Sequence, residues 1–381
     1  MTDRLADAKD LLRRFPIIDG HNDLPWEIRE QFGGDPARAA LSGPVPTTQT
    51  DLPRLAAGRV GAQFWSVYVP ATFTGDSAVT AVLEQIDVVR RMARDYPDRL
   101  ALAACAAEVD EIVASGRVAS LMGAEGGHAI ASSLGVLRSL YALGVRYLTL
   151  THNSNVGWAD AATDEPEAGG LTGFGREVVR EMQRIGMLVD LSHVAVSTMN
   201  DALDVARAPV IFSHSSARAL CDHPRNVPDD VLRRLAANNG VCMVAFVPAF
   251  VSQECADWRA GLVAETRRRG LDGRDLSAQQ AVAAGWEAAH PAPKATIAQV
   301  ADHVEHVCAV AGIEHVGIGA DYDGSPTFPE GLADVSGYPA LFAELLARGW
   351  TEADCAALAG GNIRRVLRDA ESAAGTVPAS R

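Results

Sequence analysis

The chain has 381 residues, 48% of them hydrophobic and 22% charged, which is enough apolar material for a large core and ordinary for a globular protein. Its formal net charge of −14, with no basic stripe, argues against a protein that follows a nucleic-acid backbone. Because the chain lacks a C-x-x-C pair, a signal-peptide core and an apolar run long enough to span a membrane, we expect it in the reducing cytoplasm, with no membrane or nucleic-acid partner.

Eight apolar runs of strand length follow one another along the chain. They are 16–23, 61–69, 118–126, 145–152, 187–193, 209–215, 240–246 and 316–324. Patterns of helical period separate most of these runs, for example at 78–96 and 173–186. Strands that read as continuous apolar runs and alternate with amphipathic helices are typical of a parallel sheet. Eight such units predict an α/β fold that closes into a (β/α)8 TIM-type barrel.

The barrel is predicted to be a single domain that covers residues 1–370. Residues 251–296 are too long for a simple crossover, and they are interpreted as an insertion after the seventh predicted strand, where active-site loops of barrels lie. The terminal segment 371–381 is rich in small and polar residues and is predicted to be disordered.

Side chains that can bind a metal stand at the ends of four of these runs. They are His21, Asp23, Glu125, His193 and His214. Because the carboxyl ends of barrel strands converge on one mouth, we expect these side chains to meet there. Each one alone is more often a structural residue, but together they suit two zinc ions bridged by the Glu125 carboxylate. A carbamylated lysine is the common alternative bridge, yet neither Lys9 nor Lys294 lies on a predicted strand. Cobalt or manganese could occupy the same ligands.

Other polar residues have simpler interpretations. His303 and His306 lie three residues apart on the helix before the last strand, and both are expected on its solvent face. His128 follows Glu125 closely enough either to support the site or to serve in packing. Asp190 stands shortly before the end of its strand and is expected to pair internally.

The stretch EGGHAIASSLGVLRSLYALGVRYLTLTHNSN (125–155) resembles the signature of the renal, or membrane, dipeptidase family of binuclear zinc metallopeptidases. The glutamate, the core around Gly-Val-Arg-Tyr and the terminal histidine stand at the family's spacing. Similar motifs recur at 18–26, 170–179, 189–194, 213–218, 223–230 and 317–324. The resemblance covers nearly the whole chain and implies an amidohydrolase-like barrel.

The resemblance also implies a role for individual residues. His21 and Asp23 would hold one zinc ion, His193 and His214 the other, and Glu125 would bridge the two. His152 would contact the substrate carbonyl and its oxyanion, Arg225 would bind the terminal carboxylate of the substrate, and Asp321 would shuttle protons. Asp323 is a near alternative to Asp321, which is preferred because it ends the strand.

These assignments imply a hydrolase that cleaves L-Xaa-Xaa dipeptides, accepts a D-residue at the C-terminal position and attacks the amide with a hydroxide shared by two zinc ions. The partner would be a small dipeptide, and a homodimer is the default expectation for the assembly. Two rivals remain open. One is another binuclear amidohydrolase, acting on an acyl-amino acid, a cyclic amide or a phosphoester, and the other is a metal-stabilised barrel without catalysis.

Overall fold

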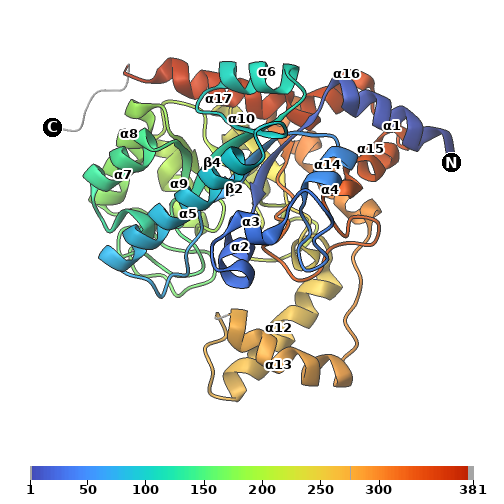
Figure 1. Ribbon diagram of the computed structural model, residues 1–381. Helices are drawn as coiled ribbons and strands as arrows, with labels where there is room; N and C mark the ends of the chain where they lie inside the picture. The colour runs from blue at the N-terminus through green and yellow to red at the C-terminus, as the bar shows by residue number, and fades with distance from the viewer. Residues whose placement is uncertain (1, 275, 376–381) are drawn as a thin grey trace.

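The computed structural model describes residues 2–274 and 276–375, and its centre is a parallel β-barrel surrounded by helices (Figure 1). The barrel strands are β1 (Ile17–Asn22), β2 (Val60–Ser66), β4 (Val118–Glu125), β5 (Val145–Thr149), β6 (Leu188–Asp190), β7 (Ile211–Phe212), β8 (Val241–Val244) and β9 (Val316–Ile318). Neighbours follow the order β2-β1-β9-β8-β7-β6-β5-β4, and a pairing of β2 with β4 closes the ring. The predicted (β/α)8 barrel is confirmed.

The helices occupy the crossovers and cover the outside of the ring (Figure 1). They are α1 (Thr2–Arg14), α2 (Leu24–Phe32), α3 (Pro36–Ala39), α4 (Leu52–Ala57), α5 (Asp76–Asp95), α6 (Ala106–Ala114), α7 (Leu134–Ala142), α8 (Gly173–Ile185), α9 (Val196–Val205), α10 (Asp229–Ala237), α11 (Pro248–Val251), α12 (Gln253–Arg268), α13 (Leu276–Ala289), α14 (Ile297–Ala311), α15 (Tyr338–Ala347), α16 (Glu352–Ala356) and α17 (Asn362–Ala373).

A further short strand, β3 (Leu100–Leu102), has no counterpart in the sequence prediction. It pairs in parallel with Val118–Ser120, the first residues of β4, whereas β5 pairs with β4 from Met122 onward. Leu102 is exposed, so β3 lacks the continuous apolar character that marks the barrel strands. The strand therefore lies outside the ring and leaves the count of barrel strands unchanged.

The two ends of the barrel differ in polarity. Near the amino ends of the strands, Ile18, Phe64 and Leu121 form an apolar cluster with residues of α6 and α17. Near the carboxyl ends, the same interior is lined by buried polar side chains, among them His21 and Glu125. Because one end is filled by packed apolar groups, the polar chemistry is confined to the mouth formed by the carboxyl ends.

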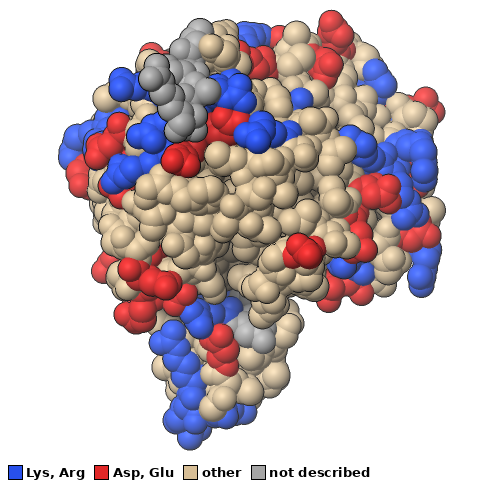
Figure 2. All heavy atoms as spheres, turned by 90° about the vertical axis from the view of Figure 1, so that its left-hand side faces the viewer, with Lys and Arg blue, Asp and Glu red and all other residues tan. Residues whose placement is uncertain are grey.

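The segment predicted as an insertion at 251–296 contains α12 and α13, which pack together and project from the lower side of the barrel in Figure 1. Figure 2 shows basic side chains gathered on this projection, whose exposed arginines include Arg267, Arg268 and Arg269. Arg274, in the turn between α12 and α13, places Nη1 2.5 Å from Asp164 Oδ1. This ion pair ties the projection to the loop that follows His152.

The prediction that His303 lies on a solvent face was wrong. The side chain is 1% exposed, its Nδ1 accepts a hydrogen bond from the Ala217 amide at 3.0 Å, and its Nε2 lies 3.2 Å from the Val251 carbonyl oxygen. The neighbouring His306 is only partly buried and pairs with Asp229. Because α14 packs against α10 and α11, the face that carries His303 is internal.

The end of the chain departs from its predicted boundary. Helix α17 continues to Ala373, and Glu371 accepts a hydrogen bond from the Ala106 amide at 2.8 Å, which extends ordered structure past the predicted start of the tail at residue 371. The remaining part of that predicted tail, 376–381, lies outside the described residues. Among the described helices, none is long and apolar enough to cross a membrane.

Candidate metal centre

The five predicted metal ligands come together at the carboxyl ends of the strands. His21 lies in β1 with Asp23 directly after it, Glu125 is the last residue of β4, and His193 and His214 follow β6 and β7. Each of the five is at most 6% exposed. Residues from four separate strands therefore form one buried cluster, as the barrel geometry predicts.

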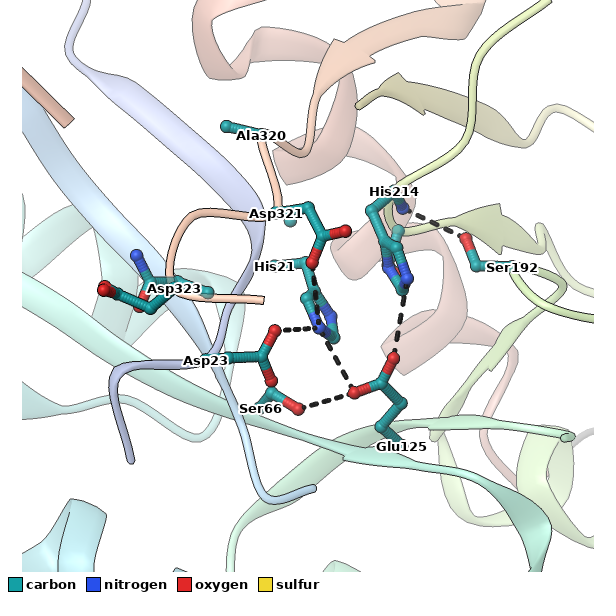
Figure 3. A network of polar contacts seen from close by, with 12 residues as sticks. His21, Asp23, Ser66, Glu125, Ser192, His214, Ala320, Asp321 and Asp323 are labelled. Carbon is teal, nitrogen blue, oxygen red and sulfur yellow. Dashed lines mark hydrogen bonds and ion pairs between the residues drawn. The ribbon is translucent and has the colours of Figure 1, made fainter. Parts of the chain in front are cut away.

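Glu125 lies below His21 and His214 in Figure 3 and contacts both. Its Oε2 lies 3.4 Å from His21 Nε2, whereas its Oε1 lies 3.0 Å from His193 Nε2 and 3.5 Å from His214 Nε2. Asp23 Oδ2 adds a contact of 3.2 Å with His21 Nε2. The two oxygens of this carboxylate thus face different candidate ligands, Oε2 towards His21 and Oε1 towards His193 and His214.

The donor set fits divalent cations. Burial lowers the pKa of His193 and His214 well below the ordinary histidine value, so both rings are neutral. Their Nε2 atoms nevertheless face each other at 3.0 Å, and the buried Asp23 Oδ1 has no hydrogen-bond partner among the described residues. A bound divalent cation would satisfy the lone pairs and carboxylate oxygens that converge in this buried site. Imidazole and carboxylate ligands are those that zinc prefers.

Asp321 joins this cluster and Asp323 does not. Asp321 Oδ1 lies 3.9 Å from His21 Nε2. Atoms of Asp321, His21 and Asp23 that could bind a metal all lie within 4.8 Å of one another. Burial raises the pKa of the Asp321 carboxyl well above its ordinary value. Asp323 turns away from the cluster (Figure 3), and its Oδ1 accepts a hydrogen bond from the Gln49 amide at 2.6 Å.

Backbone strain marks two of these positions. His193 and Asp321 adopt φ angles of 70° and 69°, in the left-handed region that residues other than glycine rarely enter. Such conformations typically cost about 1–3 kcal/mol each and collect at functional sites. At both positions the chain turns sharply after the end of a strand, and this turn directs the side chain into the mouth of the barrel.

His152 and Arg225 complete the mouth. The ring centroids of His152 and His193 are 4.4 Å apart, and His152 Nε2 lies 4.0 Å from Glu125 Oε1. Arg225 is 3% exposed, and within the described part of the chain its Nη atoms make two long hydrogen bonds of 3.4 Å, to Ser215 Oγ and the His214 carbonyl oxygen. Its guanidinium carbon lies 5.2 Å from the centroid of the Phe250 ring.

No carboxylate within residues 2–274 and 276–375 forms a direct ion pair with Arg225, although the charges of Asp321, Glu125 and Asp190 act on it from further away. Burial lowers the pKa of its guanidinium to about 10, still well above neutrality, so the group remains a cation. A buried cation that touches no carboxylate is costly unless a ligand supplies the contacting negative charge.

Three hydroxyl groups that support the ligands were missed by the sequence analysis. Tyr147 Oη lies 2.8 Å from His21 Nδ1, Ser213 Oγ lies 2.8 Å from His214 Nδ1, and Ser66 Oγ lies 3.0 Å from Glu125 Oε2. These contacts orient the ligands from behind. Two of them carried a signal in the sequence, because Ser213 stands directly before a predicted ligand and Tyr147 is the tyrosine of the Gly-Val-Arg-Tyr core.

The close packing of Gly123 against Tyr147 gives a first prediction. A Cβ at position 123 would lie 1.9 Å from Tyr147 Cζ, so Gly123→Ala must displace the ring that contacts His21. We expect the substitution to lower the free energy of unfolding by about 1–3 kcal/mol, as overpacking does. Differential scanning calorimetry of the metal-free protein should show a lower Tm. The exposed helical Gly135→Ala is the control and should raise Tm or leave it unchanged. An unchanged Tm for Gly123→Ala would contradict the packing argument.

Known proteins resemble this chain over nearly its whole length. The family model described as Membrane dipeptidase (Peptidase family M19) matches residues 5–381. Dipeptidase 3 of Mus musculus is 42% identical over 369 residues, which cover 96% of this chain and 66% of the mouse protein. Dipeptidase verJ of Clonostachys rogersoniana is 42% identical over 382 residues, covering 97% of this chain and 88% of that protein.

Among solved structures, a metallo peptidase from Rhodobacter sphaeroides, liganded with a phosphinate mimic of the dipeptide L-Ala-D-Ala, is similar with a TM-score of 0.77 and 26% sequence identity. The similarity covers 93% of this chain and 99% of that chain. The family resemblance inferred from 125–155 is confirmed by the match to the family model. The chain belongs to the membrane dipeptidase family, a family of metal-dependent hydrolases.

Proposed function

We propose that this chain is a dipeptidase that binds two zinc ions and cleaves L-Xaa-Xaa dipeptides, including those with a D-residue at the C-terminal position. The observation that carries the proposal is Arg225, a buried cation beside the cluster of candidate metal ligands that forms no direct ion pair with a carboxylate of the described residues. A guanidinium offers a planar fork that suits a carboxylate. The phosphinate mimic of L-Ala-D-Ala bound by the Rhodobacter sphaeroides enzyme supports the choice of substrate.

His21 and Asp23 would hold one zinc ion, His193 and His214 the other, and the two oxygens of Glu125 would be shared between them. When bound, zinc would polarise the scissile carbonyl and lower the pKa of attacking water. Because all these groups are buried, their interactions with a developing negative charge would be stronger than in water.

The remaining steps belong to side chains around the cluster. Arg225 would bind the substrate carboxylate and thereby place the scissile amide over the ligands. An N–H at His152 Nε2 would donate to the oxygen of the tetrahedral intermediate. The Asp321 carboxylate would take a proton from the attacking water and pass it to the leaving nitrogen. A fixed cation at this position would favour free dipeptides over longer peptides, whose terminal carboxylate lies further from the scissile bond.

Turnover of a dipeptide panel tests the proposal directly. Zinc-loaded protein is expected to cleave L-Xaa-L-Xaa and L-Xaa-D-Xaa dipeptides but not the matching tripeptides. Dialysis against a chelator should abolish turnover, and added zinc should restore it. Two bound zinc ions without cleavage of any dipeptide would overturn the proposal and favour acylated amino acids or cyclic amides as substrates.

A further inference from the structure

A buried carboxylate that is not among the proposed ligands lies behind the His193 and His214 pair. Asp190 is the last residue of β6 and is fully buried. Its Oδ1 accepts hydrogen bonds from the backbone amides of Ser192 at 3.1 Å and Ser213 at 2.8 Å. Its Oδ2 accepts hydrogen bonds from the hydroxyls of Ser213 at 2.6 Å and Thr149 at 2.5 Å. The two oxygens of Asp190 therefore face different kinds of donor.

Ser213 connects this carboxylate to a metal ligand. Its Oγ lies 2.6 Å from Asp190 Oδ2 and 2.8 Å from His214 Nδ1. An ionised carboxylate can only accept, so the single hydroxyl hydrogen of Ser213 is committed to Asp190. The contact with His214 must then run the other way, with Nδ1–H as the donor and Ser213 Oγ as the acceptor. A neutral imidazole that carries its hydrogen on Nδ1 presents a free lone pair at Nε2, the atom that faces Glu125.

His21 has a similar arrangement, in which the hydroxyl belongs to Tyr147 and its acceptor is a backbone carbonyl oxygen. Tyr147 Oη donates to the Gly20 carbonyl oxygen at 3.2 Å and lies 2.8 Å from His21 Nδ1. With the tyrosine hydrogen directed to that carbonyl oxygen, the hydroxyl is left to accept from His21 Nδ1–H. In both His21 and His214, Nδ1 therefore lies against a hydroxyl whose own hydrogen is directed elsewhere.

We infer that Asp190 is a positioning residue that acts through Ser213 to hold His214 in the tautomer able to bind a metal through Nε2. The inference rests on the metal site of the proposed function and does not depend on the substrate. This role differs from a contribution to folding alone. It depends on which atom donates in the Asp190–Ser213 and Ser213–His214 hydrogen bonds, whereas a role in folding depends only on the presence of these bonds.

Asparagine at position 190 would reverse that direction without removing the contacts. The two backbone amides can only donate, so the amide oxygen must face them and the NH2 group must face Ser213 and Thr149. Ser213 Oγ would then accept from the NH2 group and turn its own hydrogen toward His214 Nδ1. The hydrogen of His214 would move to Nε2 and block the metal-binding atom.

The test compares zinc affinity and the tautomer of His214 in the full chain. We expect Asp190→Asn to weaken the binding of one of the two zinc ions by about 10- to 100-fold, the usual effect of losing a group that orients a ligand. Zinc affinity is measured by competition with a chromophoric chelator. Nitrogen-15 NMR of the metal-free protein should show His214 changing from the Nδ1–H to the Nε2–H form. His303, whose Nδ1 accepts from the Ala217 amide, is the internal reference for the Nε2–H form.

Two controls separate the tautomer from general damage. Glu181→Gln makes the same exchange of carboxylate for amide at another buried residue, in α8, and should leave zinc affinity unchanged. In a Ser213→Ala background, Asp190→Asn should cause no further loss of zinc affinity, because the connecting hydroxyl is gone. Additive losses, an unchanged zinc affinity in Asp190→Asn, or His214 remaining in the Nδ1–H form would each overturn the inference.

Position 213 provides an independent test if Asp190→Asn does not fold. Ser213→Thr keeps the hydroxyl, whereas Ser213→Val removes it, and the valine and threonine side chains have nearly the same volume. We expect threonine to retain zinc affinity and valine to lose it, and equal affinities would refute the role of the hydroxyl. Wild-type protein that binds two zinc ions but cleaves no dipeptide would overturn the proposed function and leave this inference standing.

Discussion

Asp321→Asn is expected to lower kcat for dipeptide hydrolysis by about 10²- to 10⁴-fold while the protein keeps its zinc, because a neutral amide cannot accept the proton of the attacking water. The backbone should tolerate the change. Asp321 has a φ of 69°, and asparagine is among the few residues that enter the left-handed region readily. The measurement is kcat and KM on one dipeptide, together with the zinc content of each variant.

Asp323→Asn is the matched control for this experiment. Asp323 also has a positive φ, 66°, and it lies two residues further along the same turn. Its carboxylate accepts from the Gln49 amide and points away from the metal ligands (Figure 3). We expect kcat of Asp323→Asn to stay close to the wild-type value. A large fall in kcat for Asp323→Asn with little change for Asp321→Asn would move the proton shuttle to Asp323.

The barrel and its ligands could be predicted because both follow from local sequence. A strand that is buried on both faces reads as an apolar run, and a polar residue at its carboxyl end falls at the mouth of a parallel barrel. His193 and His214 could therefore be placed together without knowledge of which strands are neighbours. The same rule could not separate Asp321 from Asp323, because the conformation of one turn decides which carboxylate points inward.

The supporting hydroxyls depend on register, which the sequence does not show. Tyr147 reaches His21 because β5 pairs with β4 so that Tyr147 stands opposite Gly123, where the absence of a side chain leaves space for the ring. Tyr147 belongs to the Gly-Val-Arg-Tyr core of the family signature, but the run VRYLT alone does not show whether its side chain points into the barrel or out of it. His303 was misplaced for a related reason, since the exposed face of a helix depends on which neighbours cover it.

Arg225→Ala should produce a loss that depends on the substrate carboxylate. For dipeptides we expect kcat/KM to fall by about 10²- to 10³-fold, equivalent to about 2.7–4 kcal/mol, because the substrate carboxylate would lose its buried charged partner. Dipeptide amides lack that charge, so their slow hydrolysis should change little. Arg225→Lys should fall between the two, since lysine keeps the charge but lacks the planar fork. The measurement is kcat/KM for each dipeptide and its C-terminal amide.

Arg234→Ala is the control for this series, since it removes a positive charge on α10 that pairs with Asp204 on the outside of the barrel. Its kcat/KM for both substrates should match the wild-type values. Equal losses for dipeptide and amide in Arg225→Ala would show that Arg225 only supports the surrounding loop. A selective loss for the dipeptide would assign carboxylate recognition to Arg225, because only an interaction with the charged terminus separates the two substrates.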